Sequence, residues 1–96
     1  MHSIEFYVDA AKEKIGTTSN NALSLALGLS KPQVGFWLAR KTLPSDDVIV
    51  KLAEAGGQNV DLALLHLNWW RAVSKNEYSA ADHYQHMIET FFLQAA

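Results

Sequence analysis

The sequence predicts an all-α fold, with a compact domain of four helices followed by two additional C-terminal helices. Apolar residues recur at helical spacing along most of the 96 residues. No alternating run of β-branched residues bounded by turns is present, so strands are not expected. With nearly half of its residues apolar (49%) and a modest charged fraction (19%), the chain is globular rather than disordered. Its length fits one structural unit with its own core.

The first predicted helix spans residues 4–15. Its apolar residues repeat at helical spacing, and Gly16 ends it. The polar cluster that follows, residues 17–20, offers Ser19 as the N-cap of a second helix.

A short helix, a tight turn and a second short helix are expected across Ser19–Trp37. Gly28 supplies the positive φ that such a turn needs, and the small Ser24 lets the partner helix approach closely. We expect the third helix to run from about Lys31 to Arg40, with Ser30 as its cap. The apolar residues that pack the two helices together are Leu23, Leu27, Leu29, Val34 and Trp37. This spacing is typical of the helix-turn-helix, whose second helix enters the DNA major groove in DNA-binding proteins.

Three further helices complete the predicted fold. Ser45 caps the fourth, which starts with two aspartates and ends at Gly56-Gly57. Asn59 or Asp61 opens the fifth, which covers residues 60–74 and is apolar around most of its circumference, so it must be buried on several sides. After the polar break at residues 75–77, Ser79 caps the sixth. Residues 1–57 form the helix-turn-helix domain, and residues 58–96 form a helical pair that completes the core and mediates dimerisation, within one structural unit.

The composition excludes several classes of function. Without cysteine there is no disulfide, thiolate metal site or cysteine nucleophile. We expect no enzyme, because no phosphate loop, Ser/His/Asp grouping or HExxH motif occurs, and the Asp46-Asp47 pair is explained as a helix N-terminus. His83 and His86 are interpreted as solvent-facing residues opposite an apolar stripe, so no metal and no cofactor are expected. The longest apolar stretch is interrupted by polar residues and no signal peptide is present, which predicts a soluble, cytoplasmic protein without membrane contact.

An excess of positive over negative charge is confined to the helix-turn-helix region. No acidic residue occurs between Glu13 and Asp46, whereas residues 58–96 hold two cations against four acids. This distribution matters more than the net charge of −2, because a local positive surface is what attracts nucleic acid.

Residues from about 7 to 73 resemble the small phage and prophage helix-turn-helix proteins of the Cro/repressor (XRE-like) class. The segments that carry the resemblance are YVDAAKEKIG, TSNNALSLALGLSKPQVGFW and LPSDDVIVKLAEAGG. The resemblance implies a phage-type transcriptional regulator that acts in the host bacterial cell and occupies an operator on double-stranded DNA as a homodimer. It implies base contacts from Lys31, Gln33 and Phe36 and phosphate contacts from Ser19, Asn21, Arg40 and Lys41.

The chain departs from that class on the face that would touch DNA. Pro32 replaces a position that is often polar, Gly35 weakens the middle of the recognition helix, and Arg40 stands where the class often has glycine. With Phe36 and Leu38 expected to be exposed, this face is more apolar than a usual DNA-reading face. An alternative interpretation is therefore a helix-turn-helix scaffold reused as a protein-binding inhibitor of a host factor or defence system, with the Phe36/Leu38 face as its interface.

Aromatic residues in the last two helices are candidates for dimer or partner contacts. Trp69 and Trp70 point about 100° apart on a helix, so both cannot face the same core. The Phe91-Phe92 pair must either fold back onto the fifth helix or exchange with a neighbour. A symmetric dimer through the fifth and sixth helices would supply the two-fold axis of a palindromic operator.

Overall fold

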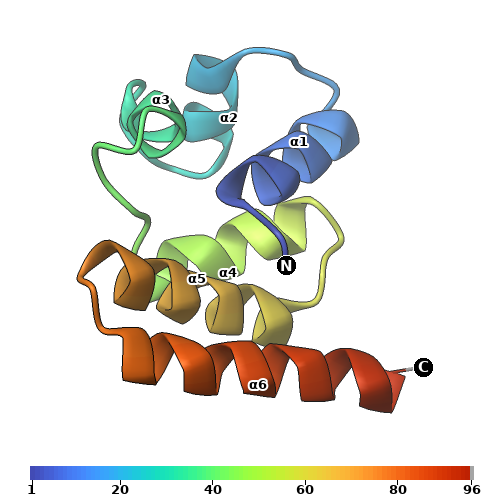
Figure 1. Ribbon diagram of the computed structural model, residues 1–96. Helices are drawn as coiled ribbons and strands as arrows, with labels where there is room; N and C mark the ends of the chain where they lie inside the picture. Colours follow the sequence, from blue (N-terminus) through green and yellow to red (C-terminus); the bar gives the residue numbers. More distant parts are fainter. Residues whose placement is uncertain (96) are drawn as a thin grey trace.

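The computed structural model describes residues 1–95, which form six helices and no strand (Figure 1). The helices are α1 (Ile4–Ile15), α2 (Asn20–Ala26), α3 (Gln33–Leu38), α4 (Asp46–Ala55), α5 (Val60–Ser74) and α6 (Tyr78–Ala95). The predicted all-α class is confirmed. None of these helices is both long and apolar enough to cross a membrane.

Three of the predicted N-cap residues accept a backbone hydrogen bond at the start of the expected helix. The hydroxyl of Ser19 accepts a hydrogen bond from the Ala22 N–H at 3.1 Å, and the hydroxyl of Ser45 accepts one from Val48 at 3.3 Å. Asn59, rather than Asp61, caps α5. Each cap satisfies one of the backbone donors that a helix start leaves without an intrahelical partner.

Helix α3 is shorter than the expected range of about 31–40, and Ser30 does not cap it. Residues 30–33 form a turn in which the Gln33 N–H donates to the Ser30 carbonyl at 3.3 Å. The Ser30 hydroxyl instead accepts a long hydrogen bond of 3.4 Å from the Gln33 side chain. The recognition helix of the prediction therefore starts two residues later.

Helix α6 starts before Ser79, so the predicted Ser79 cap is wrong. The chain leaves α5 through Asn76, whose φ is +58°, and the Glu77 N–H donates to the Ala72 carbonyl at 2.8 Å. This tight turn places Glu77 at the helix start, where its carbonyl accepts the hydrogen bond of Ala81.

The helices form a chain of contacts from one end of the molecule to the other. Helix α1 packs on α4, α4 on α5 and α5 on α6, while α2 and α3 pack on each other and on α1 (Figure 1). Gly56 allows the close approach of α1 and α4, since a Cβ there would lie 2.9 Å from the Ala11 backbone nitrogen. The α2–α3 pair and α6 therefore lie at opposite ends. The buried cluster extends into α5 and is composed mainly of Tyr7, Val8, Leu23, Val34, Trp37, Ile49, Leu52 and Leu67.

Candidate functional site

A buried hydroxyl joins α2 to α3. The Oγ of Ser24, fully buried, accepts a hydrogen bond from the Val34 N–H at 3.1 Å and donates one to the Asn20 carbonyl at 3.0 Å. Val34 lies in the first turn of α3, where backbone donors have no intrahelical partner. Ser24 thus satisfies a helix start that no residue next to α3 caps. The sequence predicts only that the small size of Ser24 allows a close approach of the two helices. Its role as an acceptor was not anticipated, although a first-turn N–H buried under α2 requires one.

The turn between the helices needs a left-handed residue, as predicted. Gly28 has a φ of +76°, and the next N–H, that of Leu29, donates to the Ser24 carbonyl at 2.9 Å. Together with the Ser24 hydroxyl, this bond fixes the position of α3 relative to α2.

The end of α3 uses a left-handed residue that is not glycine. Arg40 has a φ of +61°, and the Lys41 N–H donates to the Phe36 carbonyl at 2.9 Å. This arrangement is the Schellman ending, in which a non-glycine residue is strained by roughly 1 kcal/mol or more. The same turn directs the chain away from α3 and towards α4.

The three residues expected to contact bases lie in α3 and in the turn before it; together they are the α2–α3 edge. Lys31 is exposed in the turn before α3, Gln33 is the first residue of α3, and Phe36 follows one turn later; the last two are half-buried. The Nζ of Lys41 lies 5.8 Å from the centre of the Phe36 ring, within the range of a cation–π contact. No carboxylate occurs in this segment, because the chain has none between Glu13 and Asp46.

The four residues expected to contact phosphate differ in how free their side chains are. The Ser19 hydroxyl is occupied as the α2 cap, whereas Asn21 and Lys41 are exposed. Arg40 forms an ion pair with Glu5 of α1, with its Nη2 2.7 Å from one carboxylate oxygen. Partial burial raises the pKa of Glu5, but hydrogen bonds from its own backbone and from the Ser3 hydroxyl, and the Arg40 guanidinium, outweigh it and lower that pKa overall.

Leu38 does not lie on the exposed face where the sequence placed it. It is half-buried and packs against the hydrophobic core. Phe36 and Leu38 are two positions apart in α3, which is about 200° around the helix axis, so their side chains point in different directions. The exposed apolar face that was expected from both residues therefore contains Phe36 but not Leu38.

The aromatic residues of α5 and α6 are distributed between the core and the surface. Trp70 packs against the core and donates its Nε1–H to the His2 carbonyl at 3.1 Å, while Trp69 is half-buried. Phe91 is half-buried on the α5 side of α6, and Phe92 is 43% exposed beside the His2 ring. The outer face of α6 is polar and includes His83, His86 and Glu89, all exposed. Both tryptophans are half-buried, and α6 also exposes the side chains of Tyr78, Met87 and Leu93.

His66 is fully buried, a position that was not anticipated from the sequence. Its Nε2 accepts a hydrogen bond from the His2 backbone N–H at 3.1 Å, and its Nδ1 lies 2.7 Å from the Tyr7 hydroxyl. Burial, with smaller contributions from His2 and the N-terminal amine, lowers the pKa of His66 to about 4. The available signal was a single histidine in a helix that is otherwise apolar on most sides.

Neither a family model, a curated protein nor a solved structure matches this chain. Within residues 1–95, no group of three or more histidine, cysteine, aspartate or glutamate side chains is placed to hold a metal ion. The α2–α3 edge therefore has to be interpreted from its own side chains.

Proposed function

We propose that this protein is a DNA-binding transcriptional regulator whose α2–α3 pair is a helix-turn-helix, with α3 as the recognition helix. The observation that carries the proposal is the edge formed by Lys31, Gln33 and Phe36. Lys31 is exposed, the other two side chains are half-buried, and the segment contains no carboxylate. The buried Ser24 hydroxyl holds α3 against α2. Such a protein acts by occupying an operator and blocking or recruiting polymerase by position.

Each side chain on this edge has a chemistry that suits one part of the duplex. Lys31 donates to guanine O6 and N7, Gln33 pairs with the N6 and N7 of adenine, and Phe36 contacts a thymine methyl group. Lys41 and Asn21, both exposed, contact phosphates, as does the Ser19 end of α2. These contacts are few, so a homodimer on two half-sites is part of the proposal.

Arg40 contacts phosphate only by leaving Glu5. Both side chains are substantially exposed, at 59% and 40%, and an exposed ion pair contributes about 1 kcal/mol or less. A phosphate replaces the carboxylate with an equivalent charge-assisted hydrogen bond. The exchange is therefore nearly neutral in free energy, and Arg40 contributes less to affinity than Lys41 does.

The test is a salt titration of binding to two duplexes of equal length, one with the sequence that flanks the gene and one of random sequence. We expect tighter binding to the flanking sequence, and log affinity that falls steeply with log salt. Lys41→Ala should weaken binding to both duplexes and reduce the slope by about one, whereas Lys31→Ala with Gln33→Ala should reduce the preference between them. Lys51→Ala, an exposed lysine on α4, is the matched control and should leave the slope unchanged.

For Arg40 the informative variant is Arg40→Ala, because alanine keeps the Cβ at the left-handed backbone that arginine already adopts, so that only the guanidinium is removed. Glu5→Gln is its counterpart and should strengthen DNA binding by freeing the guanidinium. Failure to bind either duplex at low salt would overturn the proposal and direct attention to the protein-binding alternative, which now depends on Phe36 without Leu38.

The homodimer is tested separately by light scattering at tens of micromolar protein. Of the four aromatic residues expected to make dimer contacts, Phe92 is 43% exposed and the other three are half-buried. A monomer mass both free and on a two-half-site duplex would contradict this part of the proposal.

A further inference from the structure

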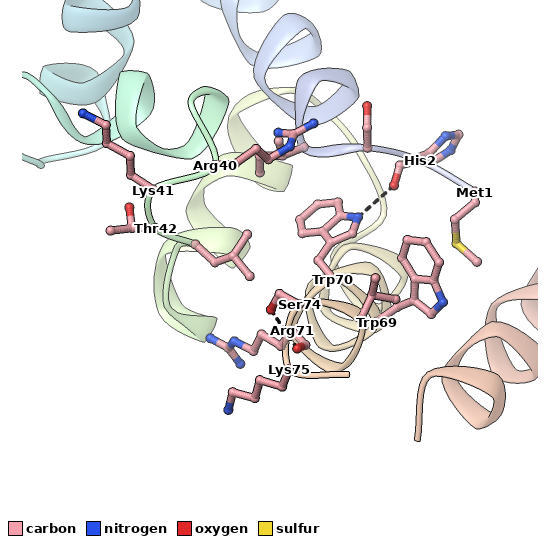
Figure 2. A pocket seen from close by; sticks show the side chains of 14 residues that line it. Met1, His2, Arg40, Lys41, Thr42, Trp69, Trp70, Arg71, Ser74 and Lys75 are labelled. Carbon is pink, nitrogen blue, oxygen red and sulfur yellow. Dashed lines mark hydrogen bonds between the residues drawn. The ribbon is translucent and has the colours of Figure 1, made fainter. Parts of the chain in front are cut away.

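A cavity of about 740 Å³ opens where three distant segments of the chain meet (Figure 2). The N-terminal segment before α1 forms one side, the connection from α3 to α4 forms the second, and the end of α5 forms the third. Pockets that bury small organic molecules in other proteins have volumes in this range. The lining contains none of Lys31, Gln33 and Phe36, so the cavity is separate from the α2–α3 edge.

Apolar side chains form most of the walls of the cavity. Among them are the side chains of Trp69, Trp70, Leu43 and Val73. The Trp70 indole is held on its protein side, because its Nε1–H donates to the His2 carbonyl at 3.1 Å, drawn in Figure 2, and the His66 ring stacks on it with the ring centres 6.1 Å apart. A flat molecule that packs against the rest of the indole therefore meets a preformed surface and does not have to order it.

The two arginines of the lining are paired with carboxylates that lie outside it. Nη2 of Arg40 lies 2.7 Å from a carboxylate oxygen of Glu5, and Nη1 of Arg71 lies 2.8 Å from one of Asp46. An anion in the cavity would have to displace one of these carboxylates to reach a guanidinium.

The two lysines of the lining are directed away from its interior. Figure 2 shows the side chains of Lys41 and Lys75 extending outwards on opposite sides of the cavity. The Nζ of Lys41 lies 5.8 Å from the centre of the Phe36 ring, which is outside the lining. Both lysines are exposed, so their ammonium groups stay in water and make no contact with a molecule inside the cavity.

This arrangement of charge disfavours ions of either sign. Within residues 1–95, no aspartate or glutamate lines the cavity, so an organic cation would lie near four positive side chains without a carboxylate to receive it. An anion would lose its hydration against apolar walls without gaining an unpaired cation. Both effects favour a molecule without charge.

We propose that this cavity binds a small uncharged aromatic molecule, whose ring packs against the accessible side of the Trp70 indole. The volume and the apolar walls select the aromatic body, and the paired or outward-directed charges select against ions. The proposal does not depend on DNA binding.

The test compares three probes that share a naphthalene body and differ in charge: naphthalene-1-acetamide, naphthalene-1-acetate and 2-(naphthalen-1-yl)ethylammonium. We expect one acetamide bound per chain, about threefold more tightly than the acetate and about tenfold more tightly than the ammonium. In a nitrogen–proton NMR spectrum, the indole signal of Trp70 should shift saturably as the acetamide is added. The signal of Trp37, which is fully buried and outside the lining, should not shift and serves as the internal reference.

Variants separate the walls from the surrounding charges. Val73→Glu should weaken the acetamide about fivefold and strengthen the ammonium, because it places a carboxylate in the lining. Val73 is 39% exposed, so the change should not disturb the core, and a folding defect would weaken both probes instead. Leu25→Glu, at an exposed leucine of α2 outside the lining, is the matched control and should change neither affinity. Lys75→Gln should leave the acetamide affinity unchanged, since Lys75 points away from the cavity.

Four results would overturn the proposal. Tighter binding of the acetate than of the acetamide would mean that the surrounding cations select the ligand. Equal affinity for all three probes would mean that the ring rests on an open surface with its polar group in water. An equal effect of Val73→Glu and Leu25→Glu, or the absence of a saturable shift of the Trp70 indole, would mean that the cavity is not the binding site. Because none of these measurements involves DNA, they leave the proposed regulator function untouched.

Discussion

The contact between α2 and α3 and the contact between α5 and α1 are each held by one buried polar side chain, and the two side chains differ in whether they titrate. Ser24 and His66 are the fully buried polar side chains of the described chain. Ser24 joins α2 to α3, and His66 joins α5 to α1 and to the N-terminal segment. Both satisfy the rule that a buried polar group is hydrogen-bonded. The hydroxyl stays neutral at every physiological pH, whereas the imidazole does so only while its environment opposes protonation.

The hydrogen bonds of His66 define which tautomer it adopts. Since Nε2 accepts from the backbone N–H of His2, the ring proton lies on Nδ1 and is donated to the Tyr7 hydroxyl. If Nε2 were protonated, its N–H would face the His2 backbone N–H, and neither group could accept a hydrogen bond from the other. The N-terminal segment would then lose its bond to His66 and the support that its carbonyl gives to Trp70. The contact of α5 with α1 and the N-terminal segment is therefore the pH-sensitive one.

The largest expected effect is a loss of stability when the pH is lowered from 7 to 5. In the folded state the pKa of His66 is about 4, against about 6.5 in the unfolded chain, so below pH 6.5 the unfolded state binds more protons. The free energy of unfolding should fall by about 2 kcal/mol at pH 5 and approach a loss of about 3 kcal/mol near pH 4. Urea unfolding followed by circular dichroism at each pH measures this.

The charged groups around His66 act in the same direction. His2, whose own pKa is lowered mainly by burial, and the N-terminal amine both disfavour a cation at His66, and Tyr7 is neutral in this range because burial raises its pKa further. His66→Gln should remove most of the pH dependence, while the exposed His83→Gln should retain it. An unchanged slope in His66→Gln would show that another group is responsible.

Ser24→Ala should cost about 2 kcal/mol, because it leaves the buried Val34 N–H without an acceptor. Unlike the His66 effect, this loss should be the same at pH 7 and pH 5. It should also weaken DNA binding if α3 is the recognition helix, since the bond fixes α3 on α2. Ser74→Ala, at an exposed serine that bonds within its own helix, is the control and should change the free energy of unfolding by less than about 0.5 kcal/mol. An equal loss in both variants would refute the role given to Ser24.

Local features of the fold were predictable from the sequence because their causes lie within a few residues. The Ser19 and Ser45 caps each bond to an N–H three residues later, and α5 begins and ends at the residues that its apolar pattern indicates. The errors at α3 and α6 are also local, since each depends on whether a turn closes over three or four residues, a choice that periodicity does not encode.

The candidate site was only partly predictable, because its other contacts join distant segments. Arg40 meets Glu5 across 35 residues, and His66 meets His2 across 64. A helical pattern states which side of a helix is buried, but it does not state which residue of another helix lies opposite. Arg40 was therefore expected to be free for phosphate, His66 was assigned no role, and the cavity beside Trp69 had no sequence signature.

The smallest expected effects come from two glycines of the α2–α3 pair and have opposite signs. Gly28→Ala should cost about 1 kcal/mol, since an alanine at a φ of +76° is strained. Gly35→Ala should stabilise by about 0.5–1 kcal/mol, because Gly35 lies inside α3 and a Cβ there meets no atom within 4 Å. Thermal and urea unfolding at pH 7 measure both. The added methyl group is the same in the two variants, so a difference in the sign of the change in unfolding free energy reports the backbone conformation at each position. Equal destabilisation would mean that the α2–α3 pair tolerates no added side chain at either position, which would contradict the explanation by backbone conformation.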